Sequence, residues 1–224
     1  CYWYTFTIIR RLVRRYLVPG ESRHEMLLLS AAFACILIHF TREMYLGNIN
    51  IILLMLGCLA IEKFLQDKQL PGGILAGIMI LAKPYLVILL LPLFLRKKWK
   101  IAGWTCLAVF AGLVLPFIYP GPHTGFSMYA GWIRTILEHG EGFPGKTSLD
   151  FFIRFICPAW PVWGILPVFL AVMALVSVFI FTGLRREKHA EDPSGMASRN
   201  FLFEWFLIMA LLPNLIRTDW VLLL

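Results

Sequence analysis

Lys83 is the residue whose type and position point most directly to chemistry. It lies inside the apolar stretch Leu70–Leu95, directly before Pro84, and has no acidic neighbour in sequence. Hydrophobic residues make up 59% of the 224-residue chain, and the mean hydropathy is +0.75, which is typical of a membrane protein. A charge inside a membrane is costly and by default marks a functional site. A phosphate held at the membrane surface would suit this lysine, and the structural alternative is an ion pair with a buried carboxylate such as Glu204.

The other groups that could do chemistry form no known catalytic or metal-binding motif. His139 lies between Glu138 and Glu141, with His123 upstream, but this spacing matches no metal site and we expect no metal. The five cysteines are scattered without paired spacing, so neither a disulfide framework nor a metal cluster is expected. We find no glycine-rich phosphate loop and no nucleophile elbow in the sequence.

The positive charge is concentrated in clusters that lie beside apolar segments. The net charge is +8 although only 15% of the residues are charged. This is the pattern of cytoplasmic loops and lipid headgroup contacts, and it argues against a nucleic-acid-binding face. The clusters are Arg10, Arg11, Arg14 and Arg15; Arg96, Lys97, Lys98 and Lys100; and Arg185, Arg186 and Lys188.

The apolar segments that must position these side chains predict an all-α, polytopic transmembrane bundle, with residues 1–224 forming part of a single membrane domain. A helix needs about 20 apolar residues to cross roughly 30 Å of hydrocarbon, so the first, second and sixth segments are short. The predicted segments are Met26–Phe40, Tyr45–Ile61, Leu70–Leu95, Ile101–Tyr119, Pro161–Thr182 and Phe201–Ile216, with another starting at Trp220.

The stretch Leu70–Leu95 conflicts with the positive-inside rule if it crosses the membrane once. With Arg10–Arg15 in the cytoplasm, a single crossing would place the cluster Arg96–Lys100 outside. The conflict disappears if the stretch enters and returns as two half-helices broken at Lys83-Pro84, because proline removes a backbone donor and disfavours a helical residue before it. Such a break is tolerated where it is buried in protein or lines a water-filled cavity. The alternative is one long helix with a proline kink.

On the re-entrant interpretation, residues 120–160 form one long external loop and residues 185–199 form a polar cytoplasmic loop. Tyr129–Glu138 has helical periodicity with an apolar face, which predicts a helix lying in the membrane interface. A flexible turn is expected at Gly140, Gly142, Pro144 and Gly145. A second amphipathic helix is expected to start near Lys146, with Thr147 or Ser148 as its N-cap.

The order of motifs resembles glycosyltransferase family 87, membrane enzymes of the GT-C class that include phosphatidylinositol mannosyltransferases dependent on polyprenyl-phosphate mannose. The resemblance covers most of the chain. It is carried by Gly47-Asn48-Ile49-Asn50, by Pro71-Gly72-Gly73-Ile74-Leu75-Ala76-Gly77 leading through Leu81-Ala82-Lys83-Pro84 to Arg96–Lys100, and by Thr147-Ser148-Leu149 followed by Arg154.

The resemblance implies transfer of a hexose, most simply mannose, from a polyprenyl-phosphate donor to a lipid or cell-envelope glycan at the outer face of the plasma (inner) membrane. Such a reaction needs a carboxylate that deprotonates the acceptor hydroxyl, and cations around the departing phosphate. The cation candidates are Lys83, Arg134, Arg154 and Arg217. Candidates for contacts with the sugar or the acceptor are Asn48, Asn50, Ser148 and Asp219. Membrane lipids and the two substrates are the expected partners, and no cofactor or nucleic acid is expected.

Several of these side chains have a structural alternative. Arg134 and Arg154 could face lipid headgroups, and Arg217 could pair with Asp219. The catalytic acid of the family is expected upstream of Cys1, because the chain begins there without a methionine and is interpreted as an internal fragment. Two other functions fit many spans with a large external loop or a broken helix, namely an O-antigen ligase or polymerase type enzyme and a transporter.

Overall fold

A computed structural model describes residues 2–17, 41, 45, 50–142, 156, 157, 159 and 165–215. Every regular element in these ranges is helical, and none is a strand. The all-α expectation is therefore confirmed for the described part of the chain. The first predicted segment, Met26–Phe40, and the segment starting at Trp220 lie outside the described residues.

The chain starts with α1 (Tyr2–Leu12), which continues as the single π-helical turn η1 (Val13–Leu17). The predicted segment Tyr45–Ile61 corresponds to α3 (Asn50–Leu65), which ends four residues later than expected because Glu62 is accommodated inside the bundle. The Nη1 atom of Arg11 lies 2.8 Å from Oε1 of Glu62. This ion pair fixes the basic end of α1 to the end of α3.

The predicted break at Lys83-Pro84 is confirmed. α4 (Gln69–Ala82) ends where Lys83 adopts an extended backbone with φ −141° and ψ 97°. A 3-10 helix, η2 (Pro84–Leu89), and the short helix α5 (Leu90–Leu95) follow. Pro84 occupies the first position of η2. A backbone N–H at this position has no acceptor within the helix, so the N–H that proline lacks is not needed.

α6 (Trp99–Ile118) runs parallel to α4, as the glycines at their interface show. A Cβ added to Gly73 would lie 2.5 Å from Cβ of Trp104, and one added to Gly77 would lie 2.5 Å from Cβ of Ala108. Because contacting residues advance together along both helices, α4 and α6 begin at the same end of the molecule. The intervening η2 and α5 therefore form a return arm.

The two turns that begin α4 and α6 have the same geometry. Asp67 and Lys97 both adopt left-handed backbone, with φ of 59° and 55°. The backbone N–H of Lys68 donates to the carbonyl of Lys63, and that of Lys98 donates to the carbonyl of Leu93, both at 2.8 Å. This hydrogen-bond pattern is the Schellman motif at a helix C-terminus. Both turns lie at the end of the molecule where α4 and α6 begin.

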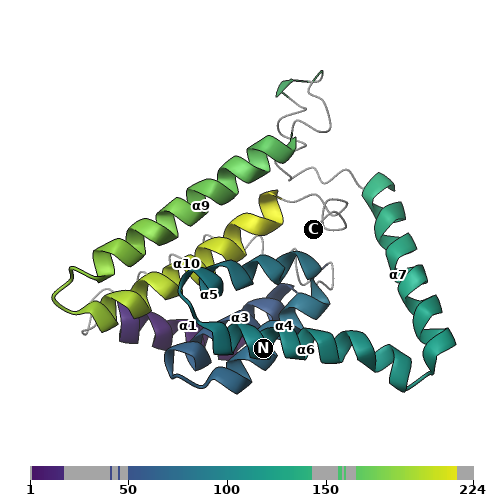
Figure 1. Ribbon diagram of the computed structural model, residues 1–224, viewed down its shortest axis with the longest axis horizontal. Coiled ribbons are helices and arrows are strands. Elements are labelled where there is room, and N and C mark those ends of the chain that lie inside the picture. The colour runs from purple at the N-terminus through teal and green to yellow at the C-terminus, as the bar shows by residue number, and fades with distance from the viewer. Residues whose placement is uncertain are drawn as a thin grey trace.

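α7 (Pro122–Gly142) leaves the end of α6 and projects away from the bundle (Figure 1). Gly121, with φ 87°, makes the turn between the two helices. The hydroxyl of Tyr129 donates to the carbonyl of Leu113 at 2.6 Å, and this bond fixes the start of α7 against α6. The predicted helix Tyr129–Glu138 is thus part of a longer one.

The flexible turn predicted at Gly140 and Gly142 is wrong for these two residues, because α7 continues to Gly142. A glycine costs a helix only about 1 kcal/mol relative to alanine, so two glycines near the end of α7 do not by themselves terminate it. The predictions for Pro144, Gly145 and the second amphipathic helix from Lys146 lie outside the described residues.

α9 (Ile165–Glu187) and α10 (Pro193–Leu215) lie side by side (Figure 1). The predicted polar loop over residues 185–199 is wrong in length, because only residues 188–192 separate the two helices. Asp192 starts α10: its Oδ1 accepts from the N–H of Gly195 at 3.0 Å and from the hydroxyl of Ser194 at 2.9 Å. These bonds stabilise the carboxylate and lower the pKa of Asp192.

The core forms where α3, α4 and α10 meet. Trp205 is fully buried, its ring lies 5.3 Å from that of Phe64, and its Nε1–H donates to the carbonyl of Gly57 at 3.2 Å. α6 is different, because large apolar side chains such as Phe110 and Leu115 are more than 60% exposed. Of the described helices, α6 alone is long and apolar enough to cross a membrane by length and composition.

Candidate functional site

Lys83 and Asn50, both predicted from the sequence as site residues, lie in direct contact. The Nζ atom of Lys83 donates to Oδ1 of Asn50 at 2.5 Å, and both residues are half-buried. The contact joins the first residue of α3 to the residue at which α4 breaks. The two residues are 33 positions apart in sequence, so only the fold could bring them together.

The geometry of the α3–α4 hairpin explains this contact. α3 has 16 residues and α4 has 14, and the tight turn at Gln66–Lys68 joins them. Two antiparallel helices of nearly equal length place the first residue of one beside the last residue of the other. Gly72 allows the close approach, because a Cβ there would lie 2.5 Å from the ring of Phe64.

The position of Lys83 suits a positively charged ammonium group. Lys83 caps the C-terminus of α4, and its backbone N–H donates to the carbonyl of Met79 at 2.9 Å. The negative end of the helix dipole favours a cation there. The amide oxygen of Asn50 accepts a hydrogen bond from the ammonium group and so orients it.

The other predicted site residues are not assembled with this pair by the described structure. Arg134 is exposed on α7. Asn48, Ser148, Arg154, Arg217 and Asp219 lie outside the described residues, and their roles stay predictions. Within the part of the chain that the structure describes, no group of three or more His, Cys, Asp or Glu side chains could hold a metal ion.

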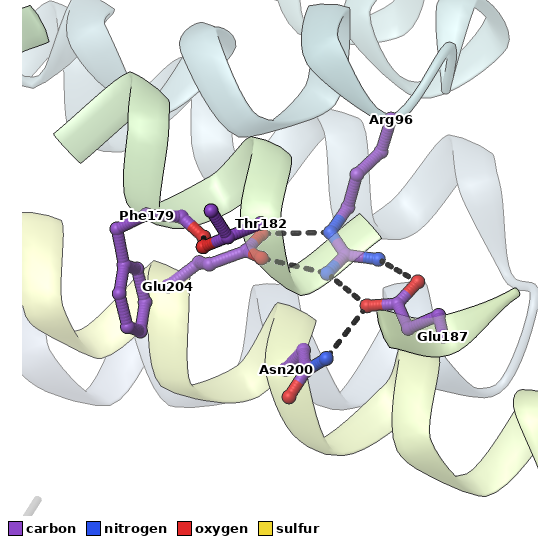
Figure 2. Close-up of polar contacts among 6 residues, drawn as sticks. All are labelled: Arg96, Phe179, Thr182, Glu187, Asn200 and Glu204. Atoms are coloured by element: carbon purple, nitrogen blue, oxygen red, sulfur yellow. Dashed lines mark hydrogen bonds and ion pairs between the residues drawn. The ribbon is translucent and has the colours of Figure 1, made fainter. Parts of the chain in front are cut away.

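Sequence reasoning missed the most extensive polar cluster of the described structure. Arg96, grouped above with the surface lysines, is buried between α9 and α10, where it donates to two carboxylates (Figure 2). Its Nε and Nη2 atoms donate to Glu204 at 2.7 and 2.6 Å, and its Nη2 and Nη1 atoms donate to Glu187 at 2.7 and 3.1 Å. Asn200 adds a 2.8 Å bond to Oε1 of Glu187.

This cluster corrects the alternative proposed for Lys83. Glu204 is 1% exposed, as its apolar surroundings in sequence suggested, but the cation that bonds it is Arg96. A glutamate between Phe203 and Trp205 signals that a buried cation is needed, whereas the sequence does not show which of several cations the topology will bring there. Arg96 reaches it because the return arm places the end of α5 beside α9 and α10.

The three residues anchor the return arm at the end opposite to Lys83. Arg96 directly follows α5, whereas Lys83 directly precedes η2. The return arm is therefore held at one end by the Lys83–Asn50 contact and at the other by the Arg96 ion pairs.

Comparison with protein families gives the same answer as the motifs. The profile of glycosyltransferase family 87 matches residues 1–212, which include the Lys83–Asn50 pair and the whole Arg96 cluster. Comparisons with curated proteins and with solved structures each found no significant match. The match extends over nearly all of the sequence, and the chain therefore belongs to glycosyltransferase family 87.

Proposed function

We propose that the protein is a multi-pass enzyme of the plasma (inner) membrane that moves a hexose, most simply mannose, from a polyprenyl-phosphate donor to a lipid or cell-envelope glycan acceptor at the outer face. Membership of glycosyltransferase family 87 supports sugar transfer. The GT-C resemblance of the motifs described above supports the lipid-linked donor. The contact between Lys83 and Asn50 supports the proposal that Lys83 binds the donor phosphate.

A membrane location accounts for the apolar surface of α6. Leu107, Phe110 and Leu115 are 53%, 64% and 62% exposed. Exposed apolar surface on this scale is unfavourable in water and favourable against lipid chains. On α4, Ile74 and Ile78 are also exposed, at 41% and 44%, so the hairpin presents a second apolar face to lipid.

The depth of Lys83 follows from the helix lengths. α4 has 14 residues, which span about 21 Å at about 1.5 Å per residue. The return arm has six 3-10 and six α-helical residues, which also span about 21 Å. Both are shorter than the roughly 30 Å hydrocarbon layer, as expected of a hairpin that enters and returns.

This depth places Lys83 within reach of a phosphate at the outer surface. If the basic turns at Asp67 and Lys97 lie at the cytoplasmic surface, the ~21 Å of α4 leave the backbone of Lys83 about 9 Å below the outer surface of the hydrocarbon layer. A lysine side chain can extend over most of that distance. Lys83 is then the cation that meets the phosphate of a polyprenyl chain anchored in the outer leaflet.

The chemical role of Lys83 in this proposal is to stabilise the leaving group. When the anomeric carbon–oxygen bond to phosphate breaks, negative charge grows on the departing phosphate, and a cation already oriented there stabilises the transition state. Asn50 holds the ammonium group in place by accepting its hydrogen bond. A carboxylate takes the proton from the acceptor hydroxyl.

The proposal is tested by the transfer of labelled sugar in membranes that contain the full-length protein. Polyprenyl-phosphate mannose is supplied as donor, and labelled lipid or glycan product is measured at equal protein abundance. Lys83→Ala should lower the transfer rate by roughly 100-fold or more, which is typical for loss of one oriented transition-state donor. Lys68→Ala, which removes an exposed lysine from the same hairpin, should retain the rate. Equal rates in both variants would contradict the role of Lys83.

A further inference from the structure

The fold gathers exposed cations from separate parts of the chain at one end of the molecule. We call this set the basic rim; it consists of Lys68, Lys97, Lys98, Lys100, Arg185, Arg186 and Lys188, all of them exposed. The turns at Asp67 and Lys97 lie at the same end because α4 and α6 are parallel. The cations at the end of α9 lie at this end too, because Arg96 forms an ion pair with Glu187. Lys97 directly follows Arg96 in sequence, and Lys188 directly follows Glu187.

Three acidic residues at this end are engaged within the protein. Glu187 and Glu204 bond Arg96, and Glu62 bonds Arg11. Glu187 and Glu204 are 8% and 1% exposed, and Glu62 is 4% exposed. Asp67, Glu191 and Asp192 are exposed in the turns before α4 and after α9. The seven rim cations outnumber them, so the exposed surface of the rim carries a net positive charge.

Aromatic rings lie beside the cations on two of the rim's helices. Trp99, flanked by Lys98 and Lys100, is 60% exposed and lies 5.5 Å from the ring of Phe94. The guanidinium of Arg185 lies 4.9 Å from the ring of Phe181, which is 53% exposed. Amphipathic aromatic rings are enriched at the level of lipid headgroups, so this combination places the rim where headgroup phosphates lie.

We propose that the basic rim binds anionic phospholipid headgroups and gives the protein a shell enriched in phosphatidylglycerol-type lipids on that face. The inference rests on the membrane location proposed above, but not on the sugar-transfer reaction. Charge complementarity selects the lipid class: phosphatidylcholine carries no net charge, whereas phosphatidylglycerol carries one negative charge. The bound group is the phosphodiester of a bilayer lipid, held by several exposed lysines and arginines at once.

The test measures which lipids remain bound to the full-length protein. The protein is equilibrated in micelles containing equal amounts of phosphatidylglycerol and phosphatidylcholine and repurified, and the retained lipids are quantified by mass spectrometry. The wild type should retain an excess of phosphatidylglycerol. Each of Lys98→Gln, Lys100→Gln and Lys188→Gln should lower that excess by up to about fivefold, the effect expected for one cation near an anionic surface.

A charge-conserving control makes the test decisive. Lys98→Arg keeps the positive charge at the same exposed position and should retain the excess. An excess that is equal in the wild type and the rim variants would overturn the inference, as would an equal loss in Lys98→Arg and Lys98→Gln. Full displacement of the lipid by inorganic phosphate at constant ionic strength would show a site for free phosphate and would also overturn it.

Sugar transfer measured on the same samples separates the two proposals. A lost lipid preference with retained transfer would leave the proposed function intact. A retained lipid preference with no transfer from polyprenyl-phosphate mannose would contradict the proposed function and leave the lipid inference standing.

Discussion

The Arg96 cluster predicts that removal of the arginine destabilises the protein far more than neutralisation of either glutamate. Arg96 makes four hydrogen bonds to two carboxylates. Its side chain is 5% exposed, and those of Glu187 and Glu204 are 10% and 1% exposed. The cluster therefore holds two negative charges against one positive charge in a nearly water-free site.

The two kinds of substitution change the charge balance in opposite ways. Arg96→Met leaves two buried carboxylates without their cation, and breaking a buried pair in this way costs about 3–5 kcal/mol. Glu187→Gln leaves one carboxylate paired with one guanidinium and retains an amide oxygen as an acceptor, so it should cost about 1 kcal/mol or less. Glu204→Gln should cost more than Glu187→Gln, because Glu204 is the more deeply buried carboxylate.

Thermal unfolding in detergent measures the difference. At about 2–4 °C per kcal/mol for a chain of this size, Arg96→Met should lower the melting temperature by roughly 6–20 °C, and Glu187→Gln by at most about 4 °C. The triple variant Arg96→Met, Glu187→Gln, Glu204→Gln should recover much of the loss, because it leaves no buried charge in the cluster. A fall in Arg96→Met no larger than in Glu187→Gln would refute this account of the charge balance.

Two further predictions concern the helix interface and the start of α10. Gly77→Ala should destabilise the protein by about 1–3 kcal/mol, because its Cβ would lie 2.5 Å from Cβ of Ala108 and 3.0 Å from the carbonyl oxygen of Thr105. Gly103→Ala, with nothing within 4 Å of its Cβ, should be neutral or stabilising by up to about 1 kcal/mol. Equal melting temperatures for the two variants would contradict the close packing of α4 on α6. The pKa of Asp192 is lowered mainly by the hydrogen bond from the N–H of Gly195, so its contribution to stability is present above the pKa of an unfolded aspartate and is lost as the pH falls through the lower pKa of the folded protein. When the pH is lowered from 6 to 3, a range that includes the pKa of about 3.9 of an unfolded aspartate, the melting temperature of the wild type should therefore fall more than that of Asp192→Asn, which keeps a capping oxygen without the titrating group. Parallel pH curves for the two proteins would contradict the cap.

The sequence was sufficient to predict the broken helix, because its cause is local. Proline after Lys83 both prevents continuation of α4 and starts η2. Charge sidedness then indicated a return, and the parallel packing of α4 and α6 agrees with that direction. The contact of Lys83 with Asn50 was within reach as well, since a hairpin of two helices of similar length brings those positions together.

The partner of Glu204 could not be predicted, because it depends on contacts between segments 108 residues apart. The sequence shows that a buried glutamate needs a cation, and both Lys83 and Arg96 border the same return arm. Only the folded arrangement decides that α5 ends beside α10. The lengths of α9 and α10 were misjudged for a related reason: residues 193–200 are polar, but the cap at Asp192 and packing against α9 make them helical.

The donor-dependent rate of sugar transfer by Lys83→Arg and Lys83→Met tests the central claim most directly. Both variants are compared with the wild type in membranes at equal abundance, over a range of polyprenyl-phosphate mannose concentrations. If the positive charge of Lys83 stabilises the departing phosphate, kcat/KM should fall by roughly 100-fold or more in Lys83→Met, and Lys83→Arg should restore a substantial part of it. Values of kcat/KM within about twofold of the wild type in Lys83→Met, a difference of only ~0.4 kcal/mol, would contradict a role for this charge in the reaction.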